Sequence, residues 1–117
     1  MQIRLTFGDS VMTANMLDNQ STRDFLAMLP LTLTLTDFHG TEKIADLPQR
    51  LSTADAPKGI GPDVGDITYY APWGNLAIFY RDFGYSAGLV KLGSIDTGAA
   101  GLAARSGDIA VTIERAD

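Results

Sequence analysis

Hydrophobic and polar residues alternate along much of this chain, with the period of two that is typical of β-strands buried on one side. The clearest case is LTLTLTDF, residues 31–38, in which the leucines should face a core and the threonines should face water. A shift of one residue would expose every leucine, so the register of this strand is strongly determined. Six further strands are predicted at residues 2–7, 11–16, 66–70, 76–80, 89–95 and 108–115.

Two short helices are expected between these strands. The first lies in NQSTRDFLAMLP, where Ser21 and Asp24 have the spacing of a capping box and Pro30 prevents continuation. The second is predicted at residues 97–105, a small, alanine-rich segment that is followed by Gly107.

The remaining segments read as turns and loops. Gly8-Asp9 is a turn signal between the first two strands, and residues 71–75 predict the loop of a second hairpin. Residues 39–62 show no regular pattern and contain several prolines and glycines. A connection this long in a small protein usually serves function or covers one end of the core.

The predicted fold is mainly β: a small closed antiparallel β-barrel with two short helices at its open ends. Strands with a single apolar face must close on themselves or pack against another sheet. A β-sandwich is therefore the alternative. The length of 117 residues fits a single domain, residues 1–117.

Composition supports a globular, turn-rich protein. Hydrophobic residues make up 45% of the chain, and the net charge is −5 without any run of Lys or Arg, which argues against nucleic acid or an anionic membrane as a partner. Twelve acidic residues are Asp and two are Glu, and there are twelve glycines, a bias toward turns over helix.

Cellular location is inferred from features that the sequence lacks. Cysteine is absent, which excludes disulfides, thiolate metal sites and a cysteine nucleophile but leaves the redox compartment open. The start MQIRLTFGDS has no apolar signal-peptide region, and no apolar stretch is long enough to span a bilayer. We therefore expect a cytoplasmic protein without membrane association.

Two segments carry a family resemblance. GDITYYAPWGNLAIFY, residues 65–80, and GLVKLGSID, residues 88–96, resemble the middle strands of the cyclophilins, with Ile78-Phe79 at the position of their paired phenylalanines. TRDFLAMLP is similar to the first cyclophilin helix. DFHGTEKIADLP and VGDITYYAPWGNLAIFYRDFGYS resemble bacterial cyclophilin-like proteins of unknown function, and this resemblance covers essentially the whole chain.

The resemblance implies the cyclophilin-like barrel but does not carry over the residues of prolyl isomerisation. Cyclophilin isomerases rely chiefly on an Arg of the third strand, in a groove lined by Phe, Trp, Gln and His. The corresponding strand LTLTLTDF has no basic residue, and Phe79 is the only groove residue with a counterpart. Leu89 replaces the groove His, and Trp73 precedes the paired-ring strand instead of following it.

An aromatic rim is the main candidate site, formed by Tyr69, Tyr70, Trp73 and Phe79 with Tyr85 nearby. Neighbouring strand residues point to opposite faces, so one ring of each adjacent pair should be core and the other should be more exposed. Trp73, between Pro72 and Gly74, escapes this alternation. It either folds over the end of the barrel or contacts a ligand.

A polar cluster, His39, Glu42 and Lys43, is expected in the loop near this rim. His39 and Glu42 together have the chemistry of a general acid–base pair, but a solvated surface loop is the favoured interpretation. No catalytic residue is assigned, and one histidine with scattered aspartates has no metal-ligand spacing. No metal and no cofactor are expected.

The preferred functional hypothesis is binding of a small molecule or peptide at the aromatic-rimmed groove, without catalysis. One alternative is enzymatic: a residual peptidyl-prolyl cis-trans isomerase, or an unrecognised small-molecule enzyme that uses His39 and Glu42. A third hypothesis is an interaction module whose aromatic rim is covered by another chain. The protein would accordingly be a monomer or a homodimer.

Overall fold

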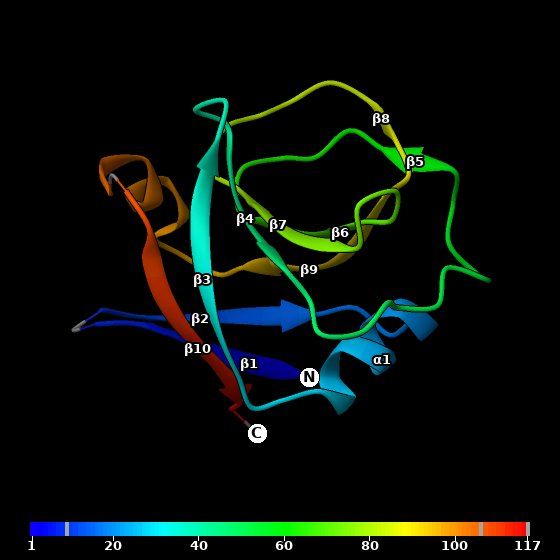
Figure 1. Cartoon of the computed structure of the whole chain (residues 1–117), viewed down its shortest axis with the longest axis horizontal. Coiled ribbons are helices and arrows are strands. Elements are labelled where there is room, and N and C mark those ends of the chain that lie inside the picture. The colour runs from blue at the N-terminus through cyan, green and yellow to red at the C-terminus, as the bar shows by residue number, and fades with distance from the viewer. Residues whose placement is uncertain (9, 106, 117) are drawn as a thin grey trace.

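The computed structural model describes residues 1–8, 10–105 and 107–116 (Figure 1). Asp9, in the turn predicted after the first strand, lies outside the described residues. The elements in chain order are β1 (Gln2–Phe7), β2 (Ser10–Met16), α1 (Gln20–Ala27), β3 (Leu31–Phe38), β4 (Glu42–Asp46), β5 (Gly59–Ile60), β6 (Asp66–Tyr70), β7 (Asn75–Phe79), β8 (Ser86–Ala87), β9 (Leu89–Ile95), the 3-10 helix η1 (Ala99–Ala104) and β10 (Ile109–Arg115).

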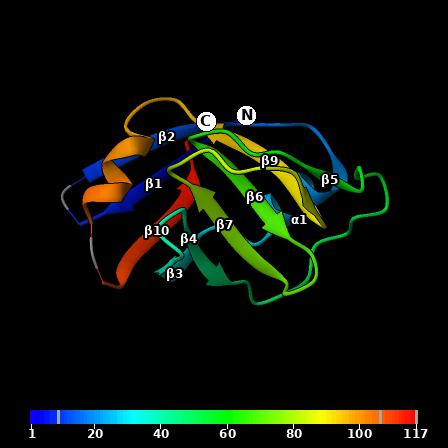
Figure 2. The same cartoon turned by 90° about the horizontal axis from the view of Figure 1, so that it is seen from above.

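Eight of these strands close into an antiparallel barrel in the order β1-β10-β3-β4-β7-β6-β9-β2. The ring is complete because β1 pairs with both β10 and β2. The predicted closed barrel is therefore confirmed, and the alternative of a sandwich is wrong. The short strands β5 and β8 pair only with each other, in a separate two-stranded sheet that lies outside the ring (Figures 1 and 2).

The strand β4 was not predicted, because residues 39–62 were expected to be irregular. In the structure β4 pairs with β3 on one side and with β7 on the other, so the ring could not close without it. Its sequence EKIAD lacks the usual strand pattern, because a polar residue points into the barrel and an apolar one points outward. Lys43 is buried, whereas Ile44 is only partly buried and packs against a separate apolar cluster.

The orientation predicted for β3 is correct. Leu35 is fully buried, Leu31 and Leu33 are partly buried, and the intervening threonines are exposed. The neighbouring strand β10 supports this register, because Val111 lies opposite Leu33 and contributes its own buried side chain. Leu35 is thus the leucine of this strand that belongs to the core.

The helix α1 closes one end of the barrel, to which it contributes the buried residues Phe25 and Leu26 (Figure 1). The predicted capping box is wrong, because Asn19 is the N-cap and its side chain accepts a hydrogen bond from the Thr22 amide at 2.8 Å. Ser21 instead donates to the backbone carbonyl of Ser52, which fastens the long 47–58 connection to the helix.

The second predicted helix is the single 3-10 helix η1, which places the fully buried Leu102 in the core. Near it, the ammonium of Lys43 donates to the Arg105 carbonyl at 2.8 Å and pairs with the Asp37 carboxylate at 3.3 Å. Tyr80 completes this cluster: its ring centroid lies 5.3 Å from Lys43 Nζ, and its hydroxyl donates to Asp37. The buried lysine is therefore compensated.

Ionisation of this cluster follows from its contacts. The hydrogen bond from Tyr80 is the main reason why the pKa of Asp37 is lowered. Burial, together with the bond to Asp37, raises the pKa of Tyr80 to about 12. At neutral pH the cluster thus contains an ionised carboxylate and a neutral phenol.

Replacement of Leu35 by Ala should lower the free energy of unfolding by ~2–5 kcal/mol, because it removes a fully buried side chain and leaves a cavity. Thr34→Ala, on the exposed face of the same strand, is the matched control and should change stability by less than ~0.5 kcal/mol. Urea unfolding followed by circular dichroism measures both. If Leu35→Ala lowered the free energy of unfolding by less than Thr34→Ala does, the register assigned to β3 would be contradicted.

Asp37→Asn should destabilise the protein more than Lys43→Met. The first change leaves an ammonium buried without its anion, whereas the second leaves a carboxylate that is 38% exposed and can be solvated. Because Asp37 is partly screened, we expect a loss of ~1–3 kcal/mol for Asp37→Asn. Unfolding at several pH values should show the difference from wild type shrinking as pH falls through the lowered pKa of Asp37. If Lys43→Met lowered the free energy of unfolding by as much as Asp37→Asn or more, this explanation of the buried lysine would be contradicted.

Candidate functional site

A hollow of about 230 Å³ lies over the outer face of the barrel, beside β4 and β7. Aromatic side chains form most of its wall, so we call it the aromatic pocket. The described residues that line it are Phe38, Glu42, Tyr70, Trp73, Asn75, Phe79, Phe83, Ser86 and Leu89.

The strand β7 is buried on both faces, and this creates the floor of the pocket. Leu76 and Ile78 point into the barrel, while Ala77 and Phe79 point outward. Together with Leu89, the two outward residues form a second apolar cluster, separate from the barrel core. Ile60 of β5 packs against this cluster, so the small outer sheet shelters one side of the pocket.

Trp73 forms an outer wall of the pocket. It lies in the turn between β6 and β7 and remains 56% exposed. Its ring meets Phe38 at a centroid distance of 5.5 Å and Tyr70 at 5.4 Å, edge to face in both cases. Gly74, which follows it, has a φ of 69°, a left-handed conformation that glycine adopts without strain. This turn keeps the indole outside the barrel.

Glu42 lies between two phenylalanines. In the strand register it is opposite Phe38 on one side and opposite Phe79 on the other. Burial raises the pKa of its carboxyl group. None of the ion pairs found among the described residues includes Glu42.

Asn75 begins β7 and is 2% exposed. Its amide oxygen Oδ1 is buried and has no hydrogen-bond partner within the described part of the chain. An acceptor left without a donor in such a place costs ~1–3 kcal/mol relative to a satisfied one. The pocket lining thus includes the Glu42 carboxylate, which pairs with no cation among the described residues, and an asparagine whose buried Oδ1 has no hydrogen-bond partner there.

Of the eight side chains predicted for the site, the structure brings four together in the aromatic pocket: Glu42, Tyr70, Trp73 and Phe79. Glu42 and Lys43 were expected in a loop, but both lie on β4 and therefore point to opposite faces. Lys43 belongs to the cluster at the end of the barrel with Asp37.

The other three predicted residues lie outside the lining. Tyr69 is 1% exposed, and its hydroxyl accepts a hydrogen bond from the Leu51 amide at 3.2 Å. His39 contacts the edge of Phe38, with centroids 4.2 Å apart. Tyr85 is 66% exposed.

Sequence reasoning did not select five of the lining residues: Phe38, Asn75, Phe83, Ser86 and Leu89. Phe38 and Phe83 carry a weak signal, because each is an aromatic residue at the end of a strand or in a loop. Asn75 carries none, since an asparagine beside glycine in a hairpin is ordinarily a turn residue.

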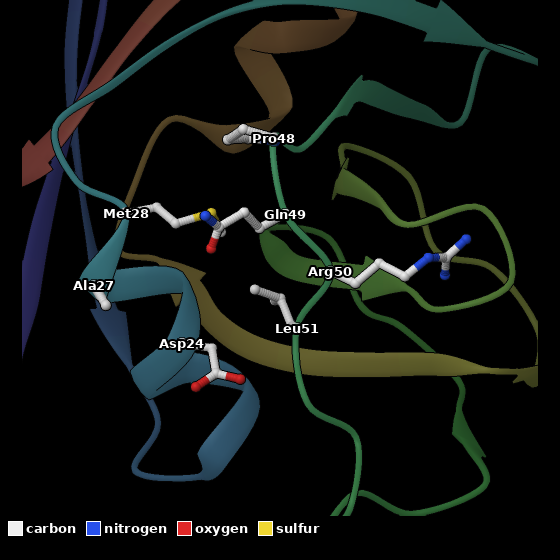
Figure 3. A pocket seen from close by; sticks show the side chains of 7 residues that line it. All are labelled: Asp24, Ala27, Met28, Pro48, Gln49, Arg50 and Leu51. Carbon is white, nitrogen blue, oxygen red and sulfur yellow. The ribbon is translucent and has the colours of Figure 1, made fainter.

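A larger hollow, about 520 Å³, lies between α1 and residues 48–51 (Figure 3). Its carboxylate, Asp24, accepts hydrogen bonds from the Ser52 amide and from Gln20, which lower the Asp24 pKa. Arg50 points away from the hollow in Figure 3 and donates to the Ala71 carbonyl at 2.9 Å. These polar groups already have partners, so the hollow is best explained as the seam where the long connection crosses the helix.

The described residues contain no group of three or more His, Cys, Asp or Glu side chains placed to hold a metal ion. No helix among them is both long enough and apolar enough to cross a membrane.

Comparison with known proteins gives a family but no assigned activity. The search of curated proteins returned no match. Among solved structures, the chain is similar to the solution structure of the hypothetical protein AF2241 from Archaeoglobus fulgidus, with a TM-score of 0.67 and 18% identity over 99% of this chain and 95% of the other. That likeness concerns the fold alone. The model of the cyclophilin-like family matches residues 5–114, and the chain therefore belongs to the cyclophilin-like family.

Proposed function

We propose that this protein binds a small organic molecule, or a short segment of a peptide, in the aromatic pocket and catalyses no reaction on it. The single observation that carries the proposal is a pocket walled by aromatic rings that holds a carboxylate without a paired cation in the described residues, Glu42, beside Asn75, whose buried Oδ1 has no partner there. Ligand pockets combine such apolar walls with a few polar groups that orient the ligand.

The exposed rings support the same conclusion. Trp73 and Phe83 are 56% and 53% exposed, yet each contacts another ring of the pocket, Phe79 in the case of Phe83. Large aromatic side chains that stay in contact with water lose the free energy that burial would provide. A ligand that covers them recovers this free energy, which favours binding.

Residual prolyl isomerisation is the first alternative. Family membership favours it, but β3 has no basic side chain and the pocket lining in the described residues includes no arginine or histidine. His39 is outside that lining, so an acid–base pair of His39 and Glu42 has no support from the pocket geometry. Turnover of a proline peptide that cyclosporin inhibits would favour isomerisation over simple binding.

An interaction module is the second alternative, in which another copy of the chain covers Trp73 and Phe83. Sedimentation over a wide range of protein concentrations distinguishes it. A dimer that Trp73→Ala dissociates would favour this alternative over a small ligand.

Trp73→Ala should weaken a ligand found by unbiased thermal-shift screening by more than about tenfold, because an aromatic anchor commonly contributes over ~1.4 kcal/mol. It should leave the melting temperature of the free protein within a few degrees, because the side chain is 56% exposed. Tyr85→Ala is the matched control: its ring is 66% exposed, is outside the pocket lining, and should change neither quantity. Equal weakening by both variants would place the ligand elsewhere.

Glu42→Gln should stabilise the free protein at pH 7 by on the order of 0.5 kcal/mol, because it removes a charge that burial disfavours. The pKa of Glu42 is raised in the folded state. Burial of its charge therefore destabilises the folded protein above that pKa, and this destabilisation disappears as the pH falls through it. The gain should therefore vanish in acid. Glu114→Gln, on β10 in an exposed pair with Arg4, is the control and should show no such gain. Urea unfolding between pH 4 and pH 8 measures the difference, and a destabilised Glu42→Gln at neutral pH would contradict this explanation.

A further inference from the structure

The charge of the aromatic pocket is negative, and this restricts its ligand. Its described lining contains one carboxylate, that of Glu42, and no lysine, arginine or histidine. The neighbouring Lys43 does not neutralise it, because that ammonium points into the barrel and pairs with Asp37. An anionic ligand would be repelled, and a neutral ligand would further desolvate an uncompensated charge.

The rings that surround Glu42 favour the opposite sign. Phe38 and Phe79 lie on the strands at either side of it, and Trp73 meets Phe38 edge to face. The faces of aromatic rings attract a cation within about 6 Å of the centroid, and desolvation strengthens that attraction. A carboxylate among several rings is thus an environment that compensates a positive charge.

Asn75 adds a requirement for a donor. Asn75 lines the same pocket, and its buried Oδ1 lacks a hydrogen-bond partner among the described residues. A quaternary ammonium has no N–H to offer, whereas a primary or secondary ammonium can donate one hydrogen to this oxygen and another to Glu42. The unpartnered Oδ1 of Asn75 therefore favours primary and secondary ammonium ions over quaternary ones.

The size of the pocket limits the rest of the ligand. A volume of about 230 Å³ is below the ~300–1,000 Å³ of pockets for drug-sized ligands. It accommodates an ammonium group with a compact apolar stem, which would pack against Phe79, Phe83 and Leu89.

We infer that the aromatic pocket recognises a protonated primary or secondary amine on an apolar stem, with the nitrogen between the Glu42 carboxylate, the aromatic faces and Asn75 Oδ1. This inference rests on the proposed binding function and specifies its ligand class. A free organic amine and the lysine side chain of a peptide share this chemistry.

The test uses Trp73, the only tryptophan of the chain, as a fluorescent reporter within the pocket. Its emission is titrated at pH 7 with benzylamine, which is protonated there, and with benzyl alcohol, a neutral molecule of similar shape that also donates a hydrogen bond. Nα-acetyl-lysine N-methylamide is the third probe and represents a peptide lysine. We expect benzylammonium to bind at least about tenfold more tightly than benzyl alcohol.

Glu42→Gln should remove this preference by weakening benzylammonium while leaving benzyl alcohol nearly unchanged. Glu114→Gln replaces the only other glutamate, on a different strand, and should preserve the preference. Circular dichroism verifies that both variants are folded. Tighter binding of the lysine probe than of benzylammonium would assign the pocket to a peptide, and the reverse would assign it to a free amine.

The outcomes separate this inference from the proposed function. Equal affinity for benzyl alcohol and benzylammonium, or a preference that survives Glu42→Gln, overturns the amine specificity but leaves a binding pocket. Failure of all three probes to give a saturable change overturns the amine inference. The proposed function would be overturned in turn if the unbiased screen yielded no ligand sensitive to Trp73→Ala.

Discussion

Closure of the barrel is the constraint on which the rest of this structure depends. Because β1 pairs with both β10 and β2, and β4 joins β3 to β7, every strand of the ring has a neighbour on each side. The ring leaves each side chain only two directions, inward or outward. Eight strands enclose an interior that side chains fill, as Leu35 and Tyr69 do here, so a ligand must bind outside the ring or at its ends.

The outer face of β7 shows how such a site can arise. Most barrel strands expose their outward residues, but Ala77 and Phe79 are buried beneath the excursion that carries β5 and β8. This additional layer gives an apolar floor, and the turn with Trp73 adds a wall. The family's barrel thus provides the support, while loops of this chain determine the shape of the pocket.

Two adjacent residues illustrate how the same fold treats charge in opposite ways. Lys43 is 1% exposed but compensated by Asp37, by the Arg105 carbonyl and by the ring of Tyr80. Glu42 points to the other face, where burial raises its pKa and no described cation pairs with it. The first arrangement stabilises the end of the barrel. In the proposed function, a ligand of opposite charge would recover the free energy that the second arrangement leaves, which would be a common compromise between stability and function.

The sequence by itself determined the strands with regular alternation, such as β3, because one-sided burial leaves a period of two in the residues. It favoured a barrel, but only the strand pairings excluded a sandwich. It also indicated that Trp73, between Pro72 and Gly74, would escape the strand alternation, and the structure leaves its side chain 56% exposed. Only the tertiary structure revealed β4, whose buried lysine and outward isoleucine invert the usual pattern. The tertiary structure was also needed to place Asn75 in the pocket and Tyr69 in the core. Each loop covers one face of a strand, and that face is set by pairings between residues far apart in the chain.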